Sequence, residues 1–586
     1  MLKFPFEKLR KGQEEIIKEV RESIKGHENL MIQAPTGFGK TVAVLFAALN
    51  ETMPDKKKVL LLTSRHTHQK IVYDTIERIS KNSSTKIKYM GINGKSTMCL
   101  FENAVEGSIF NEFCRTVKER GMCRFYERTY FQGKPSSIAS MAMRAGISRP
   151  EEAMEAGRLY TLCPYELSII GARNSDVIVA NYSHVFNPSI FPSFSSKTGI
   201  DPENTVLIVD EAHNLPSRIT EMNSISLSIK TIEKAYEEVA IYNQELARKL
   251  KTIISYAKKS GEEKKINLKE IFDADDEMIV DEIIKRNEST VNVPYSLYLK
   301  NFINKAIEAD DSYIEYITNE NGRSRIHIDS LDPSKYSAEI LNDFSSSILI
   351  SGTLKPMEMF SNILGIPDCK KLSVENHFPA ENRYIINDVS ATSKFSSRGE
   401  FSIKIAEKLE EIKNNFEYGS VVFFPSYEFM SSVVSKIKDR SGLLIEEQNM
   451  SREKQAELLS KLNSQRNMLF AVIGGSFSES IDLNNKAVKL IVIVGVPFEP
   501  PSLKLKALQE YYQKKFGNGF EYAQVLPAMI KTMQAAGRAI RSEKDRAVIV
   551  LMDYRFQSGL LRKYLPEDIK VTDENLLEEI KSFRLA

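Results

Sequence analysis

The sequence predicts an α/β protein whose strands form parallel sheets covered by helices. Short continuous apolar runs, at residues 30–32, 206–209 and 348–350, have the composition of strands that are buried on both faces. A segment of helical length and composition, TVAVLFAALNE, follows the first of these runs. A chain of 586 residues is long enough for several such domains.

The composition excludes several classes of protein. Hydrophobic residues make up 42% of the chain, which is enough for sizeable cores, yet no apolar run reaches the roughly 18 residues of a membrane span. The first residues, MLKFPFEKLRKGQEEII, lack the apolar centre of a secretion signal, so we expect none. A net charge of +2, from 80 basic and 78 acidic residues, argues neither for nor against nucleic acid, so any basic track must be local.

The segment MIQAPTGFGKT, Met31–Thr41, is similar to a phosphate-binding loop, although alanine stands where the pattern has its first glycine. Gly37 and Gly39 let backbone N–H groups point at phosphate oxygens, Lys40 can reach the β- and γ-phosphates, and the Thr41 hydroxyl can ligate Mg²⁺. A chance glycine-rich turn is the alternative, and the preceding strand and following helix disfavour it. The expected nucleotide-binding residues are Ala34, Pro35, Thr36, Gly37, Phe38, Gly39, Lys40 and Thr41.

Two carboxylates, Asp210 and Glu211, follow the apolar run at residues 206–209 in the sequence DEAH. A carboxylate at the carboxyl end of a buried strand can hold the Mg²⁺ of a phosphate-loop ATPase, which is the role we expect for Asp210. Glu211 can orient and deprotonate the attacking water. An ordinary acidic loop is the alternative, but such a loop rarely follows a buried strand in a chain that also has a phosphate loop.

Two later segments complete the expected catalytic set. SSSILISGTLKP ends a third buried strand in Ser351-Gly352-Thr353, a weak signal for a segment that senses the phosphate state. MIKTMQAAGRAIRSEKD offers Gln534, Arg538 and Arg541, which we expect to share one helix face and point at the γ-phosphate. A solvated basic helix face is the alternative, and the small residues beside Arg538 favour close packing instead.

Four of the five cysteines gather in one segment: Cys99, Cys114, Cys123 and Cys163, with 14, 8 and 39 residues between them. These gaps do not match the paired C-x-x-C of a zinc ribbon. Four thiolates could hold a four-iron cluster, or the four could be unrelated buried cysteines, and the spacing does not decide between the two. Cys369 is interpreted as a small core residue.

Taken in order, these motifs resemble those of superfamily 2 helicases, and among them the XPD-type iron–sulfur DNA helicases, relatives of the FANCJ and DinG groups. The resemblance covers nearly the whole chain. The segments that carry it are FPFEKLRKGQ, APTGFGKT, LLTSRHTHQ, DVIVANYSHVF, DEAH, SGTLKP, VVFFPSY, GGSFSESIDL, GVPFEPP and QAAGRAIR. Each motif is modest alone, and their order makes the set specific.

The resemblance implies further site residues. Gln13 lies in the adenine-sensing motif, and Asp482 lies in motif V, where we expect a nucleotide contact. The family's four cysteines, the last in Cys-Pro-Tyr, hold a [4Fe–4S] cluster, so Cys99, Cys114, Cys123 and Cys163 are its expected ligands. Motif V departs from the family pattern, because Ser480 stands where glycine is usual. If that position needs positive φ, serine weakens the coupling between ATP and DNA rather than ATP binding.

DNA contacts are expected at several polar and aromatic positions. Arg65 in motif Ia is a good phosphate ligand, and Asn181 and Tyr182 lie where the family contacts the strand. Phe125 and Tyr126 lie among basic residues in the cysteine segment, and bases stack on such aromatic side chains. An ordinary small core is an equally good interpretation of either aromatic residue.

The implied architecture has two RecA-like parallel-sheet motor domains, with an iron–sulfur cluster insertion and a helical arch insertion in the first. Residues 1–90, 170–215 and 335–375 are expected to form motor domain 1, and residues 376–586 motor domain 2. The cluster domain is expected at residues 91–169 and the arch domain at residues 216–334.

The implied function is an ATP-dependent helicase in DNA repair that moves 5′ to 3′ on single-stranded DNA and unwinds forked duplex DNA, with ATP, Mg²⁺ and the [4Fe–4S] cluster as cofactors. The polarity comes from the resemblance alone. Two alternatives stay open: a DNA-stimulated translocase that remodels protein–DNA complexes without productive unwinding, and a DNA-binding scaffold whose ATP cycle serves partners. We expect a monomer without membrane contact in the cytoplasm of a prokaryote, specifically an archaeon.

Overall fold

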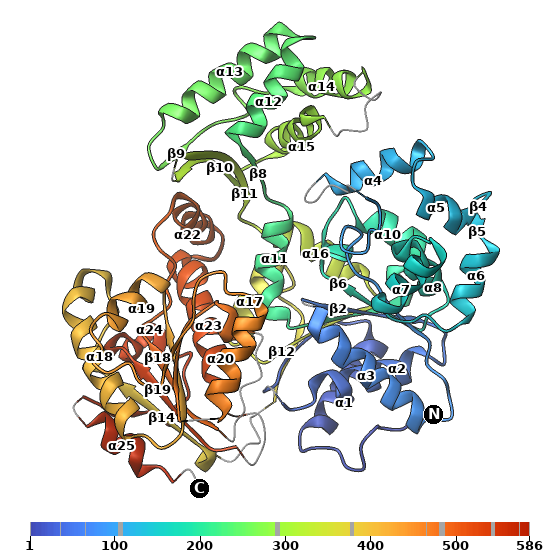
Figure 1. The fold of residues 1–586 in the computed structure, drawn as a ribbon. Coiled ribbons are helices and arrows are strands. Elements are labelled where there is room, and N and C mark those ends of the chain that lie inside the picture. Colours follow the sequence, from blue (N-terminus) through green and yellow to red (C-terminus); the bar gives the residue numbers. More distant parts are fainter. Residues whose placement is uncertain are drawn as a thin grey trace.

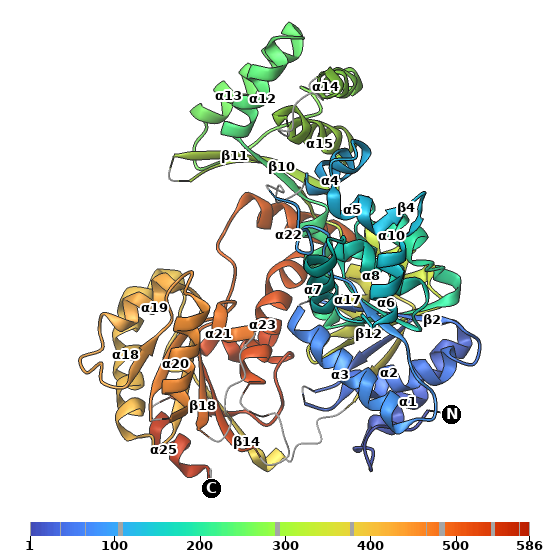
Figure 2. The same cartoon turned by 45° about the vertical axis from the view of Figure 1, so that its right-hand side comes forward.

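The computed structural model shows two seven-stranded parallel sheets side by side, with two insertions beyond them (Figures 1 and 2). It describes residues 2–35, 37–64, 66–102, 109–286, 294–320, 322–374, 380–464, 466–479, 487–538, 540, 545–573 and 575–584. The predicted fold class, with two RecA-like sheets, is confirmed.

The first sheet has the strand order β13-β1-β12-β7-β2-β6-β3, and its neighbouring strands are parallel. Its strands are β1 (Leu30–Gln33), β2 (Lys58–Thr63), β3 (Tyr89–Gly91), β6 (Val177–Asn181), β7 (Thr205–Asp210), β12 (Ser346–Ser351) and β13 (Lys370–Ser373). Because both faces of the sheet are covered, the central strands β7 and β12 are buried along their whole length, and their middle residues form the apolar runs seen in the sequence.

Helices cover both faces of this sheet, and alternate residues of one strand serve different cores. Leu30 and Ile32 face the core under α1 (Gln13–Gly26), α2 (Lys40–Thr52) and α3 (His66–Asn82). Met31 faces the opposite core. That core is closed by α8 (Pro164–Arg173), α10 (Phe191–Thr198), α11 (Leu215–Met222), α16 (Ser334–Asp343) and α17 (Met357–Leu364).

The second sheet has the order β16-β17-β15-β18-β19-β14-β20, again with parallel neighbours. Its strands are β14 (Arg383–Asp388), β15 (Gly419–Phe424), β16 (Leu443–Ile445), β17 (Met468–Val472), β18 (Val488–Val494), β19 (Ala547–Met552) and β20 (Lys570–Thr572). One face is covered by α18 (Arg398–Asn415), α19 (Tyr427–Val434) and α25 (Leu576–Ser582), and the other by α20 (Arg452–Ser464), α23 (Leu526–Ala536) and α24 (Gly559–Arg562).

The first insertion is small and contains the cysteine segment. Its elements are α4 (Phe110–Glu119), α5 (Arg124–Thr129), the hairpin β4 (Tyr130–Phe131) and β5 (Lys134–Pro135), α6 (Ser137–Arg144) and α7 (Pro150–Tyr160). Phe110, Phe113 and Val117 form its own small core, against which three of the cysteines pack.

The second insertion was predicted to be helical, and this prediction was incomplete. It contains α12 (Ile229–Ala240), α13 (Gln244–Lys259), α14 (Ala274–Arg286) and α15 (Tyr295–Glu308). It also contains an antiparallel sheet of order β8-β11-β10-β9, formed by β8 (Ile225–Ser228), β9 (Glu263–Lys265), β10 (Tyr313–Glu320) and β11 (Arg323–Ser330). Ile326 and Ile328 alternate with polar residues and face the helices, which is the period of a half-buried strand.

A helix of motor domain 2, α22 (Leu503–Phe516), extends away from its own sheet and packs beneath the sheet of the second insertion (Figure 1). Lys504 forms an ion pair of 3.0 Å with Asp329, and Lys515 one of 2.7 Å with Asp332. The second motor domain therefore contacts the base of this insertion directly. None of the helices in the described ranges is long and apolar enough to span a membrane.

Candidate active site between the two parallel sheets

The phosphate-loop segment joins β1 to α2, as predicted. Gly37 and Gly39 have φ values of 78° and 81°, in the left-handed region that favours glycine. Ala34 is not among the residues with positive φ, and its N–H donates to the Ser351 carbonyl at 3.1 Å. Alanine therefore fits the first position of the pattern without strain. Thr36 lies outside the described residues.

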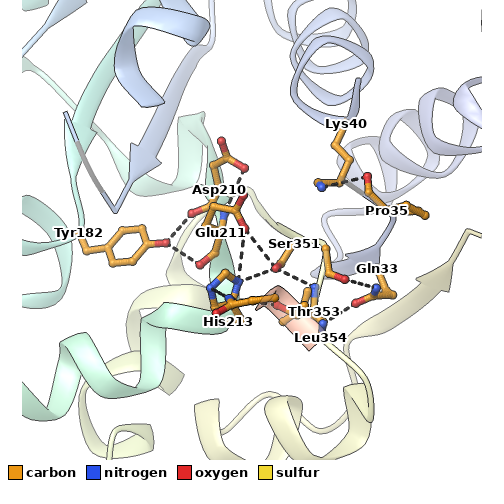
Figure 3. Close-up of polar contacts among 12 residues, drawn as sticks. Gln33, Pro35, Lys40, Tyr182, Asp210, Glu211, His213, Ser351, Thr353 and Leu354 are labelled. Carbon is orange, nitrogen blue, oxygen red and sulfur yellow. Dashed lines mark hydrogen bonds and ion pairs between the residues drawn. The ribbon is translucent and has the colours of Figure 1, made fainter. Parts of the chain in front are cut away.

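The side chains around this loop hold its backbone. Lys40 is buried and its Nζ donates to the Pro35 carbonyl at 3.2 Å (Figure 3). Gln13 Nε2 donates to the Phe38 carbonyl at 3.0 Å, and a Cβ on Gly39 would lie 2.7 Å from that nitrogen. Gln13, predicted from the adenine-sensing motif, thus lies against the phosphate loop itself, where only glycine leaves room for it.

The carboxyl ends of β1, β12 and β7 are neighbours, which brings the phosphate loop, Ser351 and the DEAH segment to one edge of the sheet. Asp210 ends β7 and is buried, and its carboxylate accepts a hydrogen bond from the Thr41 side chain. The two residues predicted to hold Mg²⁺ are therefore in contact. Glu211 has a φ of 52°, a conformation that is uncommon for glutamate, and its carboxylate accepts a hydrogen bond of 3.4 Å from Ser351 Oγ.

The environment drives the pKa values of these two carboxyl groups apart. Burial, together with the neighbouring Glu211 charge, raises the pKa of Asp210. Burial acts on Glu211 in the same direction, but the hydrogen bond with His213 and the Lys40 charge outweigh it and lower the pKa of Glu211. Glu211 is therefore the more acidic of the two carboxyl groups, which suits a general base, since a base must be ionised before it accepts a proton.

His213 connects the DEAH segment to Ser351 of the SGTLKP segment (Figure 3) and to Gln534 of the second motor domain. Its Nδ1 lies 2.6 Å from Ser351 Oγ and 3.3 Å from Glu211 Oε2. Its Nε2 lies 2.6 Å from Gln534 Nε2, which belongs to motor domain 2. Because an amide nitrogen can only donate, His213 Nε2 is the acceptor and Nδ1 carries the proton. The neutral imidazole thus relays a hydrogen bond from the second motor domain toward Ser351 and Glu211.

The prediction that Arg538 lies on the same helix as Gln534 was wrong. α23 ends at Ala536, and Gly537 caps it, so Arg538 lies in the turn beyond the helix. A glycine ends this helix because it is a poor helix former. Arg541 lies outside the described residues.

Sequence reasoning missed Gln33, the last residue of β1. Its Nε2 donates to the Gly352 carbonyl at 2.5 Å, and its Oε1 accepts from the Leu354 N–H. Gln33 thereby fixes the SGTLKP segment beside the phosphate loop (Figure 3). A polar residue at the carboxyl end of an otherwise apolar strand was the signal that could have identified it.

The four cysteines of the first insertion line one cavity: Cys99, Cys114 on α4, Cys123 before α5 and Cys163 before α8. Lys95, Lys118 and Glu166 line it as well. Burial raises the pKa of the Cys99 and Cys114 thiols, and raises that of Cys163 to about 12. Within the described ranges, no three His, Cys, Asp or Glu side chains converge closely enough to hold a single metal ion.

Comparisons with known proteins agree with this geometry. A DEAD/DEAH box helicase family model matches residues 10–110, a DEAD_2 model residues 62–232, and a helicase C-terminal domain model residues 409–572. The chain is 28% identical over 579 residues to the ATP-dependent DNA helicase XPD of Sulfolobus acidocaldarius, covering 95% of this chain and 98% of that protein.

More distant relatives and solved structures give the same result. The ATP-dependent DNA helicase CHL1 of Scheffersomyces stipitis is 22% identical, covering 86% of this chain and 71% of that protein. A solved structure titled XPD_Helicase superposes with a TM-score of 0.70 at 24% identity, covering 97% of this chain and all 100% of the other. The chain belongs to the XPD-type helicases. It is an ATP-dependent DNA helicase and therefore an ATP-hydrolysing enzyme.

The residues that the XPD-type resemblance suggested as DNA contacts have different surroundings. Tyr182 is buried, and its hydroxyl donates to the backbone carbonyls of Asp210 and Glu211, so its side chain supports the DEAH segment. Asn181 is half-buried and accepts from Gln69 Nε2 at 3.0 Å. Arg65 lies outside the described residues.

The two aromatic residues of the cysteine segment also differ from each other. Phe125 is buried and lines the cysteine cavity, and its carbonyl accepts from the Cys163 N–H at 3.1 Å. Tyr126 is half-buried, and the Lys118 ammonium lies 4.0 Å from its ring centroid. Only Tyr126 of the pair has a partly exposed ring. Ser480 and Asp482 of motif V lie outside the described residues.

Proposed function

We propose that this helicase moves 5′ to 3′ on single-stranded DNA and unwinds forked duplex DNA, acting as a monomer in DNA repair in the cytoplasm of an archaeon. The contact between Gln534 and His213 carries the proposal, because it joins the second motor domain to the DEAH segment of the first. A motor needs such a contact to convert hydrolysis into relative movement of its two domains. The polarity, the repair role and the archaeal origin follow from the resemblance to XPD-type enzymes.

The proposed roles at the ATP site follow from position and charge. The phosphate loop from Ala34 to Thr41 cradles the phosphates, Gln13 reports adenine through the loop, and Lys40 neutralises the β- and γ-phosphates. Thr41 and Asp210 would hold Mg²⁺, which supplies charge neutralisation on the phosphates when bound. Glu211 accepts the proton of the attacking water. Gln534, Arg538 and Arg541 complete the site from motor domain 2, and Asp482 contacts the nucleotide from motif V.

The proposed ligands of a [4Fe–4S] cluster are Cys99, Cys114, Cys123 and Cys163. Zn²⁺ bound by thiolates at about 2.3 Å would draw the sulfur atoms to within about 4 Å of one another. A four-iron cluster takes one cysteine at each iron and spreads its ligands around a larger body. All four thiols line one cavity, as the ligands of such a cluster would. When bound, it would stabilise the fold of the small insertion.

The domains are proposed to divide the work. Two domains form the motor: the first comprises residues 1–90, 170–215 and 335–375, and the second comprises residues 376–586. The insertion at residues 91–169 splits the duplex. The insertion at residues 216–334 forms the arch. Arg65, Asn181, Tyr182, Phe125 and Tyr126 remain the proposed DNA-binding positions, of which Tyr126 has the most favourable surroundings, with a partly exposed ring beside a cation.

Matched duplexes with a 5′ or a 3′ single-stranded tail test the proposal. The expected result is ATP-dependent strand separation from the 5′ tail alone. ATP-dependent displacement of streptavidin from a biotinylated single strand, without duplex separation, would support the translocase alternative. DNA-stimulated hydrolysis without either movement would support the scaffold.

A further inference from the structure

Glu446 is a fully buried carboxylate in motor domain 2, away from the ATP site described above. It follows β16, and the two strands next in the sheet are β17 and β15. The carboxyl ends of the three parallel strands therefore meet, as they do around the DEAH segment in the first sheet. Burying a carboxylate is unfavourable unless hydrogen bonds compensate for the lost water.

The hydrogen bonds of Glu446 go to two separate segments. Oε2 accepts from the Val472 N–H at 2.8 Å and Oε1 from the Ser476 N–H at 2.7 Å, so the carboxylate spans the turn after β17. Tyr427, which follows β15, bonds to the same carboxylate through its hydroxyl, and burial together with Glu446 raises the pKa of Tyr427 to about 12. Glu446 thus connects the VVFFPSY segment to the start of the GGSFSESIDL segment.

Two positions of the turn that Glu446 holds require glycine. Gly474 has a φ of 83°. A Cβ on Gly475 would lie 2.7 Å from Glu446 Oε1 and 2.9 Å from the Val472 carbonyl oxygen, so only glycine fits between them. The Glu446 carboxylate can therefore approach the turn this closely only because Gly474 and Gly475 are glycines.

This turn is linked through a short helix to α23, the helix that reaches the ATP site. α21 (Ser476–Glu479) follows the turn and packs against α23. Phe477 is fully buried in one core with Met529 and Ala536 of α23. α23 carries Gln534, whose amide reaches His213 in the DEAH segment. A continuous set of contacts thus runs from Tyr427 through Glu446 and Phe477 to the site of hydrolysis.

We propose that Glu446 is a positioning residue that couples DNA binding on motor domain 2 to ATP hydrolysis, by holding the turn at residues 474–476 in register with α23. The inference rests on the proposed function, because it assigns the DNA side of the motor to the VVFFPSY and GGSFSESIDL segments. Glu446 itself touches neither ATP nor the reacting atoms.

Glu446→Gln tests the proposal, since glutamine keeps the size of the side chain but presents an amide nitrogen to a backbone N–H. Hydrogen bonds to a charged acceptor are among the stronger ones, so we expect the stimulation of ATPase by single-stranded DNA to fall about tenfold. DNA-free hydrolysis and the KM for ATP should stay within about twofold of the parent. Glu447→Gln, at the adjacent exposed carboxylate, is the control and should leave all three unchanged.

Each other outcome overturns the proposal. Unchanged DNA stimulation in folded Glu446→Gln protein shows that the carboxylate does not couple the two events. An equal loss of DNA-free and DNA-stimulated hydrolysis shows a purely structural role. If Glu446→Gln does not fold, Tyr427→Phe replaces it, because this change removes a single hydrogen bond. Tyr427→Phe should lower the stimulation of ATPase by single-stranded DNA about twofold to fivefold and leave DNA-free hydrolysis unchanged. If single-stranded DNA does not stimulate the ATPase of the parent protein, the proposed function is wrong, and this inference is then wrong as well.

Discussion

The side-chain amide of Gln534 lies 2.6 Å from Nε2 of His213, although the two residues are 321 positions apart in the sequence. His213 in turn contacts Ser351 and Glu211. A single side chain, that of His213, therefore separates Glu211 of the first motor domain from Gln534 of the second. Removing the amide should disturb hydrolysis without disturbing the phosphate loop.

Gln534→Ala should lower kcat for ATP hydrolysis about tenfold or more and leave the KM for ATP nearly unchanged, because the lost contact orients His213 rather than ATP. Steady-state kinetics with saturating single-stranded DNA measure both constants. Lys531→Ala, which removes a partly exposed cation from the same helix, is the control. A raised KM with normal kcat would show that Gln534 binds ATP instead.

Gln33→Glu should destabilise the first motor domain by about 1 kcal/mol, because the carboxylate cannot donate to the Gly352 carbonyl and leaves a partly buried acceptor unpaired. Urea unfolding measures the loss, and ATPase should fall in parallel as the SGTLKP segment loses its anchor. Gln33→Met, which leaves both the Gly352 carbonyl and the Leu354 N–H unpaired, should be at least as damaging. An unchanged unfolding midpoint in Gln33→Glu would show that this contact contributes nothing.

The contrast between Gln33 and the phosphate loop shows what sequence patterns can predict. A strand, a glycine turn and a helix are local, so Gly37, Gly39 and Lys40 were identified from eleven consecutive residues. Gln33 and Glu446 act through partners on other strands, and no local pattern records which strands are neighbours. The strands β10 and β11 were missed for another reason, since the helical spacing of the preceding segment was extended over them. Arg538 was placed on a helix that Gly537 ends.

Purified protein should be yellow-brown, with broad absorbance in the blue part of the visible spectrum from the proposed cluster. Cys114→Ser and Cys163→Ser should bleach it, because each removes a ligand. Cys369→Ser should keep the colour, since Cys369 is buried in the core of motor domain 1 and lies outside the cavity. Stoichiometric zinc without iron, in protein prepared without oxygen, would refute the cluster.

Cys123→Ser should abolish strand separation while retaining much of the DNA-stimulated ATPase. Losing a metal site removes most of the folding energy of a small domain, whereas the phosphate loop packs in a separate core. Unwinding and ATPase are measured on the same preparation, with Cys369→Ser as the control. Unwinding at the parent rate would show that the insertion is not the wedge, and loss of ATPase from folded protein would show that the two functions are inseparable.

Unwinding of a 5′-tailed duplex by the parent protein and by Glu211→Gln, side by side, is the most direct test of an ATP-driven motor built on these two sheets. The amide cannot accept the proton of water, so Glu211→Gln should bind ATP and DNA normally and separate no strands, whereas Lys40→Ala should also bind ATP weakly. The parent should separate the 5′-tailed duplex in an ATP-dependent reaction. Near-normal hydrolysis and unwinding by Glu211→Gln would contradict the account.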